Sequence, residues 1–254
     1  MGQPHGRKIP LSLPRQFICD LMWASRGMPI VAAERRMQLG AVAQARQAAS
    51  PRPGWCALFL KAYGLVAARS PVLRRAYCTF PYPHLYEHPI NVASVSVART
   101  YADEDAVFFG HIRTPDRQTL VDIDGHLRRY QSEPVEAVPI FRRMLKISRV
   151  PLPLRRWLWW LGLNGSGRRR AQHFGTFGIS VVAGQGAGLG RLISPLATTL
   201  NYGPLAEDGT MEVRLNFDHR VLDGLVAARA LADLEELLAT EIVNELKSLH
   251  QHAA

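Results

Sequence analysis

Phe217-Asp218-His219-Arg220-Val221-Leu222-Asp223-Gly224 is the stretch of sequence that says most about the fold and the chemistry of this chain. It follows a segment of alternating apolar and polar residues and precedes a long amphipathic one, which predicts a strand, a turn and a helix. His219 and Asp223 stand four residues apart in that turn. Because the ordinary pKa of histidine is near neutrality, it is a natural acceptor for the proton of a thiol or hydroxyl nucleophile.

The segments on either side extend this pattern. Residues 211–218 predict a strand in which the apolar Met211, Val213, Leu215 and Phe217 face inward and Glu212, Arg214 and Asn216 face outward. Residues 225–249 predict a closing helix with one leucine-rich stripe. Upstream, residues 176–182 and 196–202 predict two more strands, and in the first of these Ser180 lies on the face opposite Phe177 and Ile179.

The first two thirds of the chain favour helices with one further clear strand. Residues 15–26 and 55–69 predict helices, the second largely buried and ended by Ser70-Pro71, and residues 91–98 predict a strand. Residues 133–163 predict helical pieces interrupted by prolines. No internal repeat is present, and the pattern predicts an α+β fold, a sheet with helices on one face.

Composition indicates a globular chain in a reducing compartment. The 254 residues, 47% of them hydrophobic, suffice for one large domain or two small ones. No membrane span or signal peptide is evident. Three widely spaced cysteines (Cys19, Cys56 and Cys78) without a C-x-x-C motif are expected to be reduced, as in the cytoplasm.

The positive charge is concentrated in one part of the sequence. Between Glu136 and Glu207 there is no acidic residue, whereas ten arginines and lysines account for the net charge of +10. A localised cationic surface suits a coenzyme A phosphate, an acidic carrier protein, a membrane surface or a nucleic acid. A solvated basic surface without a partner is the alternative.

Other signatures point away from several common classes of site. The glycine-rich loop 184–190 has neither dinucleotide-binding nor Walker spacing, and we interpret it as a flexible turn. His84 and His88 are flanked by Pro83 and Pro89, so no metal site is expected. No G-x-S-x-G motif is present, and no nucleic-acid-binding signature accompanies the arginines, so nucleic acid is not an expected partner.

The D-H-R-V-L-D-G segment resembles the signature of the catalytic domain of the dihydrolipoamide acyltransferases of 2-oxo acid dehydrogenase complexes, in the chloramphenicol acetyltransferase-like superfamily. The resemblance covers nearly the whole chain in matching order. It includes the opening helix from Leu13 to Ser25, Phe59-Leu-Lys-Ala62, Pro89-Ile-Asn91-Val-Ala93, Gly175-Thr-Phe-Gly-Ile-Ser180 and Ser194-Pro195-Leu-Ala-Thr-Thr-Leu200. It implies a single catalytic domain over residues 1–254, built on a mixed β-sheet with helices on one face.

The resemblance also implies a mechanism. His219 would be the general base that takes a proton from the acceptor, and Ser180 would donate a hydrogen bond to the oxyanion of the tetrahedral intermediate. Asp223 would form an ion pair with Arg15 that braces the histidine loop, with an N-cap of the last helix as the simpler role for Asp223. Arg220 would be structural. Asn91, Thr198 and Thr199 would contact substrate or coenzyme A.

By the same resemblance, coenzyme A thioester is a co-substrate, no cofactor is permanently bound, and the unit is a homotrimer or a larger trimer-based assembly. In the family the histidine of one subunit faces the serine of its neighbour. Residues 1–12 would form a flexible arm, with no lipoyl or subunit-binding domain. Residues 141–170, rich in tryptophan and arginine, would be an insert, either a buried tryptophan helix with a basic outer face or a docking element for an anionic membrane or a carrier protein.

Three interpretations follow. The first is a free-standing cytoplasmic acyltransferase, peripheral to the membrane if the region Arg142–Arg170 binds lipid, using acyl-coenzyme A or an acyl-carrier protein. The second is the core acyltransferase subunit of a 2-oxo acid dehydrogenase complex. The third is a non-catalytic trimeric scaffold that binds a membrane or protein through the basic insert.

Overall fold

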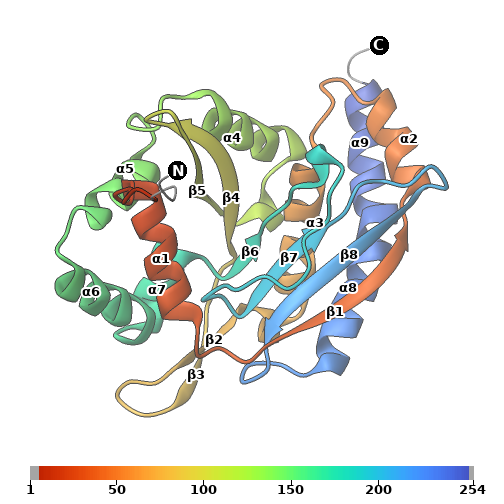
Figure 1. The fold of residues 1–254 in the computed structure, drawn as a ribbon. Coiled ribbons are helices and arrows are strands. Elements are labelled where there is room, and N and C mark those ends of the chain that lie inside the picture. Colours follow the sequence, from red (N-terminus) through yellow and green to blue (C-terminus); the bar gives the residue numbers. More distant parts are fainter. Residues whose placement is uncertain (1–5, 252–254) are drawn as a thin grey trace, which may run out of the picture.

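A mixed six-stranded sheet forms the centre of the molecule (Figure 1). The computed structural model describes residues 6–251. The strands are β1 (Ile30–Gln38), β4 (Val92–Tyr101), β5 (Glu104–Arg113), β6 (Phe177–Ile179), β7 (Thr198–Tyr202) and β8 (Thr210–Asp218), in the order β1-β8-β7-β6-β4-β5. The short β6 is parallel to both of its neighbours, and every other pairing is antiparallel. The predicted α+β class is confirmed.

Strand β8 shows how the sequence specifies the sheet. Met211, Val213, Leu215 and Phe217 are buried in the core, as their alternation predicts. The expectation that Asn216 faces solvent is wrong, because the loop before β7 covers that face of the strand. The side chain of Asn216 is buried and accepts a hydrogen bond from the Leu192 amide at 3.0 Å.

A layer of helices covers one face of the sheet (Figure 1). They are α2 (Gly40–Ala48), α3 (Trp55–Arg69), α4 (Leu120–Ser132), α8 (Gly224–Leu237) and α9 (Val243–Gln251), the last two joined by a π-helical turn at Leu238–Ile242. Helix α3 lies at the centre, where Phe59 stacks on Tyr202 of β7 at 4.3 Å and Tyr63 meets Phe177 of β6 edge-on at 4.8 Å. The two predicted helices 55–69 and 225–249 are thus part of the same layer.

A second group of helices packs at the β5 end of the sheet. It comprises α1 (Leu13–Ser25), α5 (Pro139–Ser148), α6 (Leu152–Asn164) and α7 (Gly167–Phe174). The ring of Phe17 in α1 lies 5.0 Å from that of Trp159 in α6, and a buried ion pair between Asp20 and Arg155 joins the same two helices. The segment 141–170 therefore forms α5, α6 and the start of α7, and it packs on α1 and β5.

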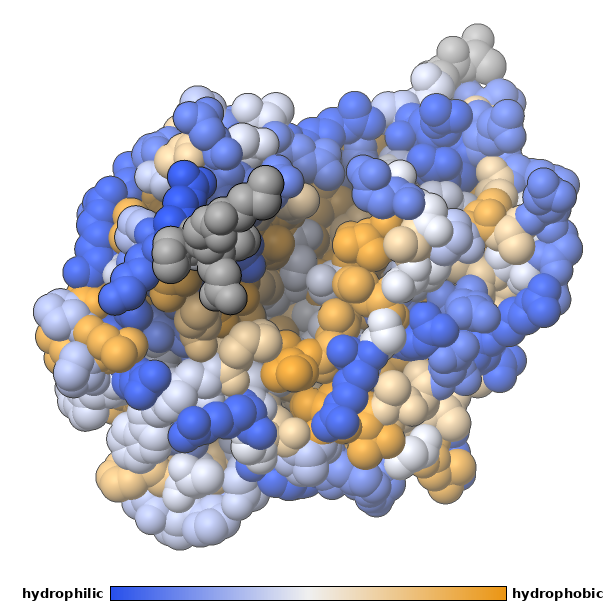
Figure 2. Space-filling view, in the orientation of Figure 1, coloured by the Kyte–Doolittle hydropathy of each residue, from blue (hydrophilic) through white to orange (hydrophobic). Residues whose placement is uncertain are grey.

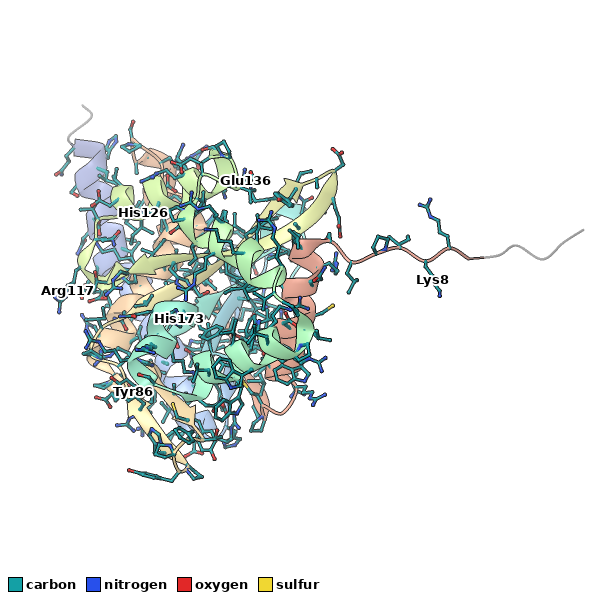
Figure 3. The ribbon with its side chains drawn as sticks, turned by 90° about the vertical axis from the view of Figure 1, so that its left-hand side faces the viewer. Lys8, Tyr86, Arg117, His126, Glu136 and His173 are labelled. Atoms are coloured by element: carbon teal, nitrogen blue, oxygen red, sulfur yellow. The ribbon has the colours of Figure 1, made fainter. Side chains whose placement is uncertain are left out.

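The remaining elements are short. Strands β2 (Arg75–Cys78) and β3 (His84–Glu87) form a hairpin, and 3₁₀ turns span Pro71–Arg74, Pro115–Arg117 and Ala183–Gln185. Of the predicted arm, residues 1–5 lie outside the described residues, and residues 6–12 carry Lys8 away from the body of the molecule (Figure 3). Within residues 6–251, no helix has the length and apolar character needed to cross a membrane.

Candidate active site

The turn that carries His219 is held by its neighbours. The carboxylate of buried Asp218 accepts hydrogen bonds from the Arg220 amide at 3.0 Å and from the Arg220 guanidinium at 2.9 and 2.7 Å. That guanidinium also lies over the ring of Tyr77 at 4.5 Å. Since Arg220 closes the turn in this way, its side chain is structural and leaves His219 to project from the end of β8.

His219 is available for chemistry. Its amide donates to the Pro29 carbonyl at 3.1 Å, and its side chain is 49% exposed. The Asp223 carboxylate lies 3.4 Å from Nδ1. A carboxylate on this side favours the tautomer that carries its proton on Nδ1, which leaves Nε2 free to accept one.

Asp223 and Arg15 do not meet within one chain, so the expected ion pair between them is wrong for the single subunit. Asp223 occupies the N-cap position of α8 without a side-chain capping bond in the described structure, and its side chain is 81% exposed beside His219. Arg15 lies in the first turn of α1 and is 3.6 Å from Glu104, at the start of β5. The start of α8 and the start of α1 lie at opposite ends of the molecule (Figure 1).

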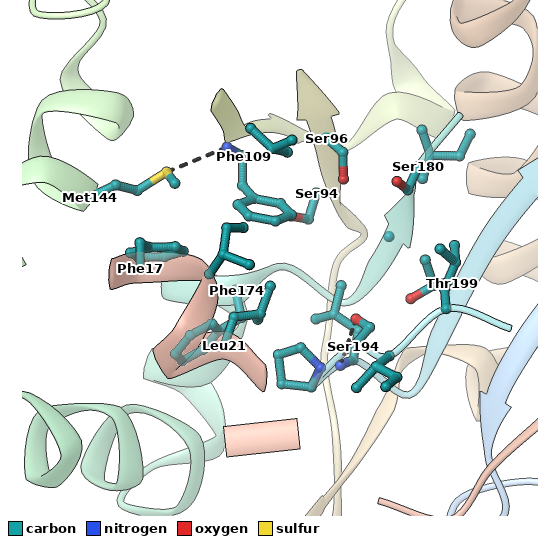
Figure 4. Close-up of a pocket in the computed structure, with 18 of the residues that line it drawn as sticks. Phe17, Leu21, Ser94, Ser96, Phe109, Met144, Phe174, Ser180, Ser194 and Thr199 are labelled. Atoms are coloured by element: carbon teal, nitrogen blue, oxygen red, sulfur yellow. Dashed lines mark hydrogen bonds between the residues drawn. The ribbon is translucent and has the colours of Figure 1, made fainter. Parts of the chain in front are cut away.

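Ser180 lines a cavity on the face of the sheet away from α3. It follows β6 directly, and its amide donates to the Leu200 carbonyl at 3.1 Å. The cavity has a volume of about 230 Å³ and lies between strands β4, β5 and β6 and helices α1, α5, α6 and α7 (Figure 4). We call it the serine pocket, because Ser94, Ser96, Ser180 and Ser194 line it together with Thr199 and a largely apolar wall. Figure 2 shows a hollow bordered by hydrophobic residues on this face of the molecule.

Strand register aligns the hydroxyl groups of the serine pocket. Ser94 of β4 pairs with Gly178 of β6, and Val95 pairs with Ile179, so Ser96 comes level with Ser180. Gly178 in turn pairs with Thr199 of β7. A Cβ atom on Gly178 would lie 3.0 Å from Leu196 and 3.1 Å from Thr199, so the glycine keeps the space between the two strands open.

The three predicted substrate-contacting residues have different surroundings. Thr199 lines the serine pocket, and its buried hydroxyl has no hydrogen-bond partner among the described residues. Thr198 is fully buried and lies outside the residues that line the pocket. Asn91 is also outside it, and its amide nitrogen donates to the Gly64 carbonyl and to Asp116, both at 2.9 Å. Only Thr199 is therefore placed to contact a ligand there.

Two histidines that line the pocket, His111 and His173, are not predicted from the sequence. Burial, followed by the nearby His173 and Arg143, lowers the pKa of His111 to about 4. Burial, followed by Arg143 and Arg169, lowers the pKa of His173. Both imidazoles are consequently neutral near pH 7 and offer hydrogen bonds rather than charge. No motif in the sequence surrounds either residue.

Ser180 and His219 lie at opposite ends of the sheet. Ile179 pairs with Leu200, which brings Ser180 level with Asn201 of β7. Phe217 pairs with Thr198 in the antiparallel direction, which brings His219 level with Leu196. At about 3.3 Å per residue, the two are about 16 Å apart along the strands, so they cannot act on one bond within a single chain.

Similar proteins are found among solved structures; no family model and no curated protein matches the chain. A probable dihydrolipoamide acetyltransferase from Listeria monocytogenes has a TM-score of 0.68 at 16% identity, over 94% of this chain and 95% of its own. The dihydrolipoamide acetyltransferase of Azotobacter vinelandii has a TM-score of 0.64 at 18% identity, over 95% and 94%. A chloramphenicol acetyltransferase has a TM-score of 0.51 at 13% identity, over 90% and 96%. The chain therefore has the chloramphenicol acetyltransferase-like fold of the dihydrolipoamide acetyltransferases, as its motifs predicted.

Proposed function

We propose that the protein is an acyltransferase that moves an acyl group from a coenzyme A thioester, or from a carrier-protein thioester, to a thiol or hydroxyl acceptor. The observation that carries the proposal is the braced turn after β8, which presents His219 with Asp223 at its Nδ1. The Azotobacter vinelandii enzyme was investigated for the catalytic roles of a serine, a histidine and an asparagine, the last two four positions apart, as His219 and Asp223 are here.

The proposed reaction needs no bound cofactor. Nε2 of His219 takes the proton of the acceptor S–H or O–H as that atom attacks the thioester carbonyl. Ser180 donates a hydrogen bond to the resulting oxyanion, and one such donor contributes about 3 kcal/mol to lowering the barrier. The intermediate then collapses, the C–S bond breaks, and the departing thiolate takes the proton from the imidazolium. The acyl group ends on the acceptor and the coenzyme leaves as a free thiol.

We propose further that each active site forms between two copies of the chain in a homotrimer or a larger trimer-based assembly. The argument is the separation of about 16 Å between Ser180 and His219 along the strands. Since neither residue can reach the other internally, His219 of one copy would face the serine pocket of the next. A ring of identical head-to-tail contacts provides such a pairing at every interface.

Thiol release from a panel of acyl-coenzyme A thioesters tests the proposal. We expect release that requires an acceptor and falls by at least about 100-fold in His219→Ala and in Ser180→Ala. His126→Ala, a histidine on α4 outside the described cavities, is the matched control and should retain activity. A variant at His219 that equals wild type with every donor and acceptor would contradict the mechanism and favour a scaffold.

The preferred acyl acceptor distinguishes a complex core subunit from a free-standing enzyme. Dihydrolipoamide as the preferred acceptor would indicate the core subunit of a 2-oxo acid dehydrogenase complex, and preference for another thiol or hydroxyl would indicate a free-standing enzyme. We propose the free-standing enzyme in the cytoplasm, where free Cys19, Cys56 and Cys78 would remain reduced.

The exposed apolar surface of α6 favours a second role for the protein, binding to the surface of an anionic membrane. Trp157 and Trp160 of α6 are exposed, as are Leu152 and Leu154 at its start, in the region without acidic residues. Indole rings beside arginines suit the lipid headgroup region. We expect sedimentation with vesicles containing phosphatidylserine, loss of that binding in Trp157→Ser with Trp160→Ser, and none with neutral vesicles. Equal sedimentation of the variant and wild type would exclude this surface.

A further inference from the structure

A second cavity lies against the serine pocket, between helices α5, α6 and α7. Its volume is about 330 Å³, within the range of small-molecule sites. Phe17, Trp159, His173 and Phe174 are among the residues that line both cavities, so the two share a wall. We call the second cavity the arginine pocket, because Arg143 of α5 and Arg169 of α7 line it.

The interior of the arginine pocket suits a hydrocarbon. Met144, Ile147, Leu158 and Phe174 contribute apolar side chains. Gly162 and Gly165 also line it, and the Cβ that Gly162 lacks would lie 3.1 Å from the ring of Phe174. Two buried polar side-chain atoms of this wall, Nε1 of Trp159 and Nδ1 of His173, have no hydrogen-bond partner in residues 6–251. Both residues also line the serine pocket, so they form part of the wall that the two cavities share.

The charged groups of the pocket carry an unbalanced positive charge. Arg143 and Arg169 are both exposed, and neither is within ion-pair distance of a carboxylate in the described part of the chain. The guanidinium of Arg143 instead lies 3.4 Å from Nε2 of His173. An imidazole carries no negative charge in either of its protonation states, so it provides no counter-charge. Two exposed guanidinium groups without a carboxylate partner among the described residues therefore line a cavity with several apolar side chains.

We propose that the arginine pocket binds a free medium-chain carboxylate, a single hydrocarbon chain with one anionic head. The chain would occupy the space between α5, α6 and α7. The carboxylate would accept hydrogen bonds from Arg143 and Arg169, whose planar guanidinium groups match its two oxygens. A thioester has no such carboxylate, so this ligand is distinct from the acyl donor, and its binding does not depend on the proposed transferase activity.

Calorimetric titration of the full-length protein with decanoate, below its micelle concentration, tests the site. We expect saturable binding that weakens at least about tenfold in the double variant Arg143→Gln with Arg169→Gln. The matched control, Arg142→Gln with Arg168→Gln, removes the same charge from exposed neighbours that do not line the cavity. Decanol, which has the same chain without charge, should bind at least about tenfold more weakly than decanoate.

Several outcomes would overturn the proposal. They are the absence of saturable binding to wild type, equal weakening in the two double variants, and equal affinity for decanol. A cavity-filling variant, Gly162→Leu, tests the position of the chain, and it should bind decanoate at least about tenfold more weakly. Unchanged affinity in a Gly162→Leu protein with a native circular dichroism spectrum would place the ligand elsewhere. If that variant does not fold, the arginine pairs still decide the question.

Discussion

His111 is a residue whose surroundings strongly alter its chemistry. It projects from β5 into the serine pocket, where burial and two neighbouring groups lower the pKa of its imidazole from 6.5 to about 4. The unfolded chain leaves this residue with an ordinary pKa. The folded protein therefore binds fewer protons than the unfolded one between those two values.

That difference predicts a pH dependence of stability. Below pH 6.5 the unfolded state gains a proton that the folded state resists, so the free energy of unfolding falls as the pH decreases. Between pH 7 and pH 4 the loss due to His111 should be about 3 kcal/mol. Urea unfolding at several pH values should show a shallower dependence in His111→Asn, with His126→Asn as the control. An identical slope in the His111 variant would mean that folding does not lower the pKa of this imidazole.

Strand β6 is the element on which the geometry of the serine pocket depends. It has three residues, all buried, between two parallel neighbours. Its central Gly178 leaves the hydroxyls of Ser94 and Thr199 on either side of an open space. A side chain at this position would press on the neighbouring strand and fill that space.

We therefore expect Gly178→Ala to impair both stability and thiol release. The added methyl group would require Thr199 and Leu196 to shift, at a cost of about 1–3 kcal/mol in the free energy of unfolding. Thiol release should fall at least about tenfold, because a misplacement of about 1 Å is costly in catalysis. Gly184→Ala, at an exposed position with nothing within 4 Å of the added atom, is the control. Full activity in Gly178→Ala would show that the substrate does not use this space.

At the scale of the whole molecule, the reversal of chain direction between β7 and β8 determines where the two candidate catalytic groups lie. Ser180 follows a strand parallel to β7, whereas His219 ends a strand antiparallel to it. The groups consequently emerge at opposite ends of one sheet. In the proposed mechanism, two copies of the chain bring them together.

Mixing two inactive variants tests this arrangement. Ser180→Ala retains an intact histidine and His219→Ala retains an intact serine, so an interface between the two variants can contain one complete site. When equal amounts of the two variants are unfolded and refolded together, about a quarter of the wild-type activity should be recovered. Only that share of the interfaces pairs an intact serine with an intact histidine. Each variant refolded alone provides the baseline. No recovery in mixed assemblies of confirmed composition would mean that both residues act from one chain.

The elements that could be predicted from local sequence are those whose hydrophobic pattern and end signals are not interrupted. Helix α3 matches its predicted range, because Gly54 precedes it and Ser70-Pro71 ends it, and β8 alternates along nearly its whole length. Strand β1 was missed because the charged residues Glu34, Arg35 and Arg36 follow one another, and the structure pairs the first two with Arg214 and Glu235. Strand β5 was missed because Phe108 and Phe109 are adjacent, and the structure packs them on Phe141 of α5 and Phe17 of α1, respectively.

The sequence by itself determined the fold class and the candidate roles of His219 and Ser180, because motifs and alternation are properties of neighbouring residues. Only the tertiary structure decided which groups share a cavity. His111, His173 and Thr199 come from three separate elements, and they converge because the helices α1 and α5–α7 pack against one end of the sheet. In the folded chain, Arg15 forms an ion pair with Glu104, and Ser180 and His219 lie at opposite ends of the sheet. These relations depend on strand order and direction, which arise from packing across the whole chain.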